Sequence, residues 1–256
     1  MRSWVQWISL PMLLFLSVPV LALFLRASPQ QILDSLDQDQ VLQAIRVSLT
    51  TSLTATFLTI LFGTPLAYSL AKRRFPLQRL VDTLVDLPTV LPPAVAGVAL
   101  LVTFGRSGLL GRILEGWGIH VAFTPIAVVL AQLFVAAPLY IKSAALGFAG
   151  IDRELEQSAG LDGANRWQVF RFVITPLSWT ALLSGVVMTW ARAMGEFGAT
   201  IIFAGNFPGR TQTMPLAIYI GFEIDLQVAL ILSVILVGFS FLTLLVVKGL
   251  LVGDNP

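Results

Sequence analysis

The chain has 256 residues, of which 56% are hydrophobic and 12% are charged, and its formal net charge is +2. A soluble globular domain carries about 25% charged residues, so this composition indicates a protein whose surface faces lipid. Cysteine is absent and His120, which we interpret as a loop residue, is the single histidine. Disulfides, cysteine nucleophiles and multi-histidine metal sites are therefore excluded, and the small net charge gives no indication of nucleic-acid binding.

Six apolar stretches are long enough to cross a bilayer, which takes about 20 residues. In chain order they are Trp7–Leu25, Val47–Ala71, Leu87–Phe104, Pro125–Ile141, Pro176–Phe197 and Val228–Val247. The first could also be a cleaved signal peptide, but it exceeds the ~7–15 apolar residues of a signal core. We therefore expect an uncleaved helix there and an all-α integral membrane protein with six transmembrane helices.

Lysine and arginine are about twice as frequent in the loops that face the cytoplasm if the N-terminus lies inside, and this bias predicts that orientation. The cluster Lys72-Arg73-Arg74 contributes most to it. Both termini are then cytoplasmic. Asp34, Asp37 and Asp39 fall in the first external loop, which we interpret as a solvated acidic loop, with a face for a soluble partner as the alternative.

Prolines interrupt three of the apolar stretches. Pro65 lies in the second and Pro138 in the fourth, while Pro88, Pro92 and Pro93 lie near the start of the third. Because proline removes a backbone donor and bends a helix, we expect breaks at all three places. Such breaks suit a gate, although kinks that serve packing are the commoner explanation.

A long polar segment, residues 150–176, separates the fourth and fifth stretches. Its acidic opening run, Asp152 to Glu156, suits the positive end of a helix dipole. Gly163 predicts a break or sharp turn, and Asn165 can cap a second helix. We expect two short helices that meet at a glycine corner on the cytoplasmic side. They would insert into a groove of a cytoplasmic protein or, alternatively, lie on the lipid surface.

Arg192 and Glu196 lie four residues apart in the fifth stretch, on one face of a helix. A charge within the membrane is costly and usually faces a cavity or a partner. The pair either fixes helix packing, which we favour, or lines a transport path or its gate. Gly195, Gly198 and Gly205 flank the pair and would permit close helix packing or irregular backbone.

The sequence contains no Gly-x-x-x-x-Gly-Lys-Ser/Thr loop, no His-Glu-x-x-His motif and no candidate catalytic triad. ATP hydrolysis by this chain and intramembrane hydrolysis are therefore both disfavoured. A channel or ion-coupled transporter that acts alone needs charged residues deep in several spans. Only Arg192 and Glu196 qualify, and both lie in one stretch.

The string EQSAGLDGANRWQVFRFVITPL, from Glu156 to Leu177, resembles the EAA loop of bacterial ABC importer permeases. Gly163 and Pro176 match the glycine and the proline of that pattern, and Gln157 stands at the position of its glutamate. In this family the loop docks a helix into the ATP-binding subunit. The coupling residues that the resemblance implies are Glu156, Gln157, Ser158, Ala159, Gly163, Ala164, Asn165, Trp167 and Pro176.

Two further segments, Leu87–Gly111 and Met194–Glu223, resemble molybdate permeases, and the likeness extends over roughly Ser48 to Lys248. Related sulfate permeases have a Gly-Glu-Tyr-Gly-like segment, where this chain has Phe197. The resemblance therefore implies molybdate as the substrate, with tungstate as an indistinguishable congener and sulfate as the alternative. The residues that we assign to the pathway or its gate are Arg192, Gly195, Glu196, Gly198, Pro92 and Pro93.

The resemblance also implies the type I importer fold and an assembly. Two copies would form one pathway, with cytoplasmic ATPase subunits below and an extracytoplasmic oxyanion-binding protein above. The chain would be non-catalytic and bind no cofactor, because ATP and Mg²⁺ belong to the ATPase, and it would lie in the cytoplasmic membrane of a prokaryote. We expect a first helix and loop over 1–46, a permease core over 47–249 and a short tail over 250–256.

Overall fold

A computed structural model of the chain describes residues 2–26, 28, 30, 32, 38–72 and 77–252. The regular structure of these residues is helical throughout. In chain order the helices are α1 (Arg2–Arg26), α3 (Asp39–Ala71), α4 (Gln78–Val90), α5 (Pro93–Phe104), α6 (Gly111–Gly116), α7 (Pro125–Ala149), α8 (Arg153–Leu161), α9 (Arg166–Val169), the π-helix η1 (Phe170–Ile174), α10 (Thr175–Leu177), α11 (Trp179–Met194), α12 (Gly198–Phe203), α13 (Met214–Ile224) and α14 (Leu226–Val252). Asp34, Asp37, Arg73, Arg74 and residues 253–256 lie outside the described part.

Four of the helices, α1, α3, α7 and α14, are each long and apolar enough to cross a membrane. Two bent pairs also qualify when each is counted as one span, which gives up to six spans in the described residues. In one pair α4 meets α5 at 117°, and in the other Arg166–Leu177 meets α11 at 74°. The expected third span, Leu87–Phe104, is therefore not one helix, and α11 of the expected fifth span begins at Trp179 rather than Pro176.

The sharp turn between α4 and α5 follows from the expected prolines. Pro92 has extended backbone as the N-cap of α5, and Pro93 is its first residue. Proline is favourable at this position because its missing N–H has no helical partner there. The predicted interruption of the third stretch is confirmed, and it is a bend of 117° between two separate helices.

The prediction of breaks at Pro65 and Pro138 is wrong, because α3 and α7 continue through these residues without interruption. The two helices pack closely along each other. A Cβ added at Gly63 of α3 would lie 3.1 Å from Ile141 of α7. The hydroxyl groups of Thr64 and Tyr140 form a hydrogen bond between the two helices at 2.6 Å. Neighbouring helices can hold a helix together around a proline in this way.

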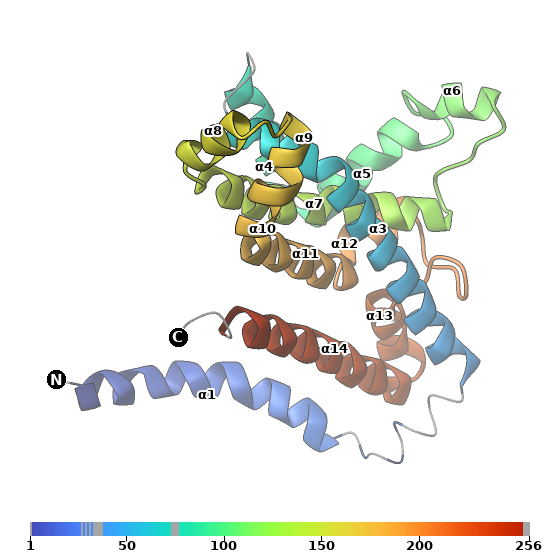
Figure 1. Ribbon diagram of the computed structural model, residues 1–256. Coiled ribbons are helices and arrows are strands. Elements are labelled where there is room, and N and C mark those ends of the chain that lie inside the picture. The colour runs from blue at the N-terminus through green and yellow to red at the C-terminus, as the bar shows by residue number, and fades with distance from the viewer. Residues whose placement is uncertain are drawn as a thin grey trace.

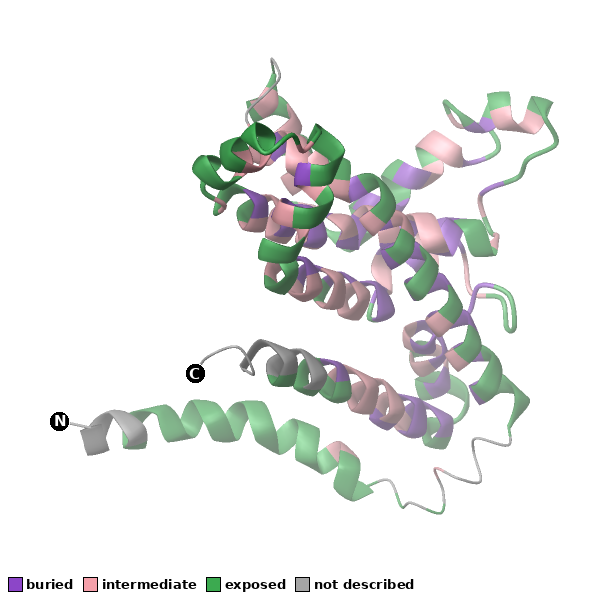
Figure 2. Ribbon diagram, in the orientation of Figure 1, coloured by how far each residue is buried: buried purple, intermediate pink, exposed green. Residues whose placement is uncertain are grey.

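α7 forms the centre of the fold, with α3 and α11 packed against it and the pair α5–α12 at its other end (Figure 1). Buried residues concentrate on these helices, whereas α1 is exposed along nearly all of its described length (Figure 2). A helix with apolar side chains on all sides and little protein contact is typical of a span that faces lipid.

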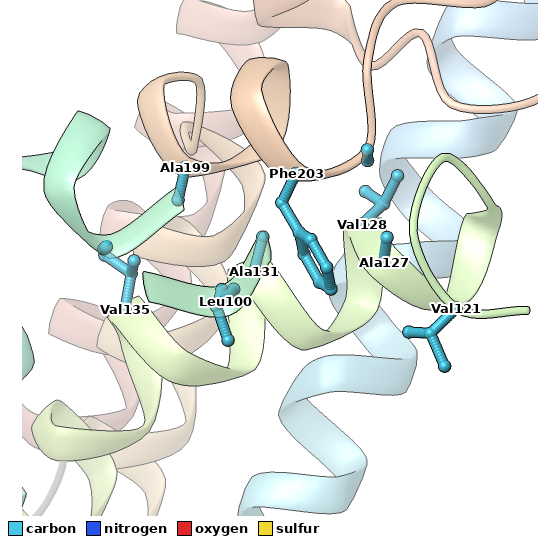
Figure 3. Close-up of a cluster of buried hydrophobic side chains, with 10 residues drawn as sticks. Leu100, Val121, Ala127, Val128, Ala131, Val135, Ala199 and Phe203 are labelled. Carbon is cyan, nitrogen blue, oxygen red and sulfur yellow. The ribbon is translucent and has the colours of Figure 1, made fainter. Parts of the chain in front are cut away.

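The buried cluster between α5, α7 and α12 surrounds the ring of Phe203 with mostly small side chains. Phe203 of α12 extends toward Ala131 and Val128 of α7, with Leu100 of α5 beside it (Figure 3). The small side chains let the three helices approach closely. This contact places α12 and the chain that precedes it.

α13, an apolar helix of 11 residues, was not predicted from the sequence. It is too short to cross a bilayer, which explains why a search for stretches of about 20 residues misses it. Its first N–H group, from Met214, donates to Ser48 Oγ of α3 at 2.7 Å. α13 is therefore fixed to the first half of α3.

Candidate coupling and translocation sites

The polar segment, residues 150–176, forms two short helices at a glycine corner, as expected. Gly163 has a φ of +91° and lies in open space, so the backbone conformation alone requires glycine there. The Ala164 N–H donates to the Ala159 carbonyl at 3.0 Å, which closes the end of α8. The position of Gly163 fixes the direction in which α9 leaves α8.

Asn165 caps the second helix, which confirms the sequence prediction. Its side-chain oxygen accepts the Gln168 N–H at 2.9 Å, and the Gln168 side chain accepts the Asn165 N–H at 2.8 Å. This reciprocal capping box stabilises a helix start by about 1 kcal/mol. A π-helical turn follows at residues 170–174, a geometry that is frequent at functional sites.

One face of the polar segment is fastened to the membrane helices. Phe170 packs edge-on against Tyr68 of α3, with ring centroids 5.3 Å apart, and Ile174 is fully buried. Lys72, just after α3, forms an ion pair with Glu156 of α8, and the two side chains are only 9% and 17% exposed. Of the residues assigned to coupling, Glu156 is therefore an anchor to the membrane helices.

The polar segment also presents large apolar side chains to the outside. Leu161 is 89% exposed, Trp167 65% and Phe172 69%. Trp167 stacks on Phe170 at 5.8 Å, which holds its ring in place. Exposed aromatic and aliphatic side chains that gather among polar residues are typical of a protein-binding surface.

The remaining residues assigned to coupling divide between exposed and partly buried positions. Gln157, Ser158, Asn165 and Pro176 are exposed, whereas Ala159 and Ala164 are partly buried against the cluster around Phe148. Small residues at 159 and 164 allow the polar segment to lie close to the membrane helices.

Arg192 and Glu196 form the expected ion pair, with Arg192 Nη1 2.7 Å from Glu196 Oε2. Glu196 is buried, while the Arg192 side chain is 36% exposed. The other carboxylate oxygen, Oε1, accepts the Ala199 N–H in the first turn of α12 at 2.8 Å. Glu196 therefore joins the end of α11 to the start of α12, a role that the spacing of charges alone does not reveal.

Two of the residues assigned to the gate, Pro93 and Gly198, come into contact where α5 meets α12. A Cβ at Gly198 would lie 2.6 Å from the Cβ of Pro93, and one at Gly97 would lie 2.9 Å from the Ala199 carbonyl. Only glycine allows this approach. Gly195, in contrast, follows α11 at an exposed position, where an added Cβ would make only an ordinary contact, 3.7 Å from the Ala191 carbonyl oxygen.

The ionic contact between α4 and α7 was not predicted from the sequence. Lys142 Nζ of α7 lies 2.6 Å from Asp82 Oδ1 and 2.9 Å from Asp86 Oδ2, both on α4. The four-residue spacing of the two aspartates places them on one helix face and was the available signal. The contact holds α4 against α7 near the 117° turn.

A family model described as "Binding-protein-dependent transport system inner membrane component" matches residues 60–251. The chain belongs to this family. It is thus a multi-pass component of the inner membrane, consistent with its several apolar helices.

Two relatives and one solved structure illustrate the match. The "Molybdenum transport system permease protein ModB" of Mycobacterium tuberculosis is 40% identical over 245 residues, 94% of this chain and 92% of that protein. The "Probable sulfate transport system permease protein cysT" of Chlorokybus atmophyticus is 35% identical over 248 residues, 95% of this chain and 87% of that protein. A "bacterial ABC transporter involved in the import of the acidic polysaccharide alginate" has the same fold, with a TM-score of 0.71 at 17% identity, covering 100% of this chain and 97% of that one.

Proposed function

We propose that the chain is the permease subunit of an ATP-driven importer of molybdate or tungstate. The family match and the 40% identity to a molybdenum permease protein support the class and the substrate. Sulfate is the weaker alternative, because the sulfate relative is 35% identical over a similar length. The observation that carries the coupling role is the polar segment, which is anchored to the membrane helices and also presents exposed apolar side chains.

The polar segment docks into a separate ATPase subunit, which binds ATP and Mg²⁺, and this chain is not itself an enzyme. Leu161, Trp167 and Phe172 enter a groove of that subunit. The ion pair between Lys72 and Glu156 then transmits its movement to α3. The corner at Gly163 sets the angle of the docking helix.

Two copies of the chain form one pathway, and a soluble binding protein delivers the oxyanion from outside. The start of α1, the end of α14 and α8 lie at one side of the molecule (Figure 1), which supports cytoplasmic termini on the same face as the polar segment. ATP binding draws the two polar segments together and opens the pathway outward, and hydrolysis reverses the movement.

The contact of Pro93 with Gly198 and the link through Glu196 set the position of α12 beside α5. The partly exposed Arg192 guanidinium faces the pathway, where it attracts the oxyanion. The bent pair α4–α5 and the short α12 form the edge of the gate.

The test is ATP hydrolysis in liposomes that hold this chain with its ATPase subunit and its binding protein. Stimulation by binding protein loaded with molybdate or tungstate, and not with sulfate, is the expected result. Stimulation by sulfate alone would keep the class and change the substrate. Uptake by this chain without an ATPase would overturn the proposal.

A further inference from the structure

A pocket of about 580 Å³ opens between the first half of α3, the start of α7 and the loop between α12 and α13. Its size falls within the range of about 300–1,000 Å³ that is typical of small-molecule sites. The charged side chains of its lining are Arg46 from α3 and Arg210 from the loop, and the lining includes no carboxylate.

Neither Arg46 nor Arg210 forms an ion pair with another described residue. Two like charges that face one pocket repel each other, and an anion between them removes the repulsion. A guanidinium group presents a planar fork of N–H donors that matches two oxygens of one anion. The charge and the donor geometry therefore both favour an oxyanion.

The loop that carries Arg210 is held rigidly against α3. Three successive N–H groups, from residues 210–212, donate to the Phe207 carbonyl at 2.9–3.1 Å. Beyond the loop, the Met214 N–H bonds to Ser48 of α3 at 2.7 Å, and Ser48 lies within one turn of Arg46. The backbone positions of the two arginines are thus fixed relative to each other before any ligand binds, which lowers the entropic cost of binding.

Gln43 supplies a neutral donor beside the two charges. Gly209 has a φ of +68°, and a Cβ there would lie 2.7 Å from Gln43 Oε1, so glycine allows the loop to approach the amide. The hydroxyls of Thr50 and Thr51 already donate to the carbonyls of residues 46 and 47, at 2.7 and 2.8 Å. The donors in the pocket are therefore the two guanidinium groups and the Gln43 amide, a set suited to several oxygens around one centre.

The pocket lies far from the polar segment along the same helix. From Arg46 to its last residue, α3 extends about 40 Å at 1.5 Å per residue, and Lys72 follows directly with its ion pair to Glu156. That length is comparable to a bilayer with its headgroups, about 40–45 Å. The pocket and the polar segment therefore lie at opposite faces of the membrane.

We propose that Arg46 and Arg210, with Gln43, form a binding site for a tetrahedral oxyanion at the face where a binding protein would deliver it. This site rests on the proposed function, and it assigns the first contact of the substrate with the permease to residues within one copy of the chain.

The test measures equilibrium binding of labelled molybdate and tungstate to the chain and its ATPase in nanodiscs, without binding protein. We expect Arg46→Gln and Arg210→Gln each to weaken binding by about tenfold, because each removes a charged hydrogen-bond donor. Arg112→Gln, at an exposed arginine outside the pocket lining, is the matched control and should bind as the wild type does. Arg210→Lys should retain part of the affinity because the charge remains.

Uptake by the complete wild-type transporter tests the proposed function separately. If both glutamine variants bind the anion as tightly as the wild type and support normal uptake, the site is overturned and the function stands. The same follows if the wild type transports the anion but shows no detectable binding. Absent uptake with arginine-dependent binding would support the site and overturn the function. Weaker docking of the binding protein with unchanged anion affinity would assign the arginines to that interface and overturn the oxyanion site.

Discussion

Lys72 and Glu156 form an ion pair that joins the end of α3 to the first helix of the polar segment. Both side chains are largely enclosed, and the aromatic contact of Phe170 with Tyr68 lies beside them. The polar segment is thus attached to α3 by an ionic contact and an aromatic one. Under the proposed function, a movement of the segment would pass through these contacts to α3.

Glu156→Gln is expected to raise the amount of ATP hydrolysed per oxyanion imported, because the segment can then shift without moving α3. It should also lower the stability of the chain by about 1–3 kcal/mol, since the Lys72 charge loses its partner. Glu154→Gln, at an exposed carboxylate of the same helix that is not assigned to coupling, is the control. Transport assays in liposomes and thermal unfolding measure the two effects, and an unchanged ratio in Glu156→Gln would contradict the coupling role of the pair.

Gly163→Ala should uncouple ATP hydrolysis from transport. A side chain at a φ of +91° costs about 1–2 kcal/mol, so the corner between α8 and α9 shifts. Gly160→Ala provides the contrast, because a Cβ there meets open space within α8 and alanine favours a helix. We expect binding-protein-stimulated ATP hydrolysis to fall in the first variant and to remain normal in the second. Equal activity in both would show that the corner geometry is not required.

Trp167→Ala should weaken the association with the ATPase by about 2 kcal/mol, the value typical of a central aromatic residue in an interface. The chain itself should keep its stability, because this side chain is 65% exposed. Trp117→Ala, at a tryptophan that is 74% exposed outside the polar segment, should leave the complex intact. Co-purification of the ATPase with each variant is the measurement. Full retention of the ATPase by Trp167→Ala would place the docking contact elsewhere.

Gly198→Ala should disturb the contact between α5 and α12, because the added Cβ would lie 2.6 Å from Pro93. Overpacking of this kind costs about 1–3 kcal/mol. Gly116→Ala adds the same methyl group at an exposed glycine of α6, where it would meet no atom within 4 Å, and should be tolerated. Thermal unfolding and oxyanion uptake of the two variants can be compared directly. Similar behaviour would argue against a tight α5–α12 contact.

Arg192→Met separates the two interpretations of the Arg192–Glu196 pair. It leaves the buried Glu196 carboxylate without its cation, which lowers the stability of the chain. Adding Glu196→Gln in the same chain should restore that stability, because the neutral amide oxygen can still accept the Ala199 N–H. If Arg192 also attracts the oxyanion, uptake stays low in the restored double variant. Uptake that recovers together with stability would reduce the pair to a packing role.

Local features of the site were predictable from the sequence. Gly163 and Asn165 act through the backbone within a few residues, so their roles follow from conformational preference and capping. The four-residue spacing of Arg192 and Glu196 likewise predicted their ion pair. The approximate positions of the spans and of the polar segment between them were also predictable, because a change from apolar to charged residues is visible in a single sequence.

Contacts between distant helices were not predictable in the same way. Pro65 lies in an unbroken α3 because its packing against α7 overrides the preference of proline for a break. The 117° turn before Pro93 depends on where α12 meets α5. A single sequence carries no direct signal of which two helices come into contact. The short α13 was not predicted because it is shorter than the thickness of a bilayer requires.

The continuity of α3 through Pro65 has a mechanical consequence. A helix that is kinked or hinged at its middle can absorb a displacement of one end by bending there. α3 has no such break between Arg46 and Ala71. Under the proposed function, a displacement at its Lys72 end would therefore tilt or translate the arginine pocket at the other face of the membrane. The energy of ATP hydrolysis and the affinity for the transported anion would then be linked through one piece of backbone.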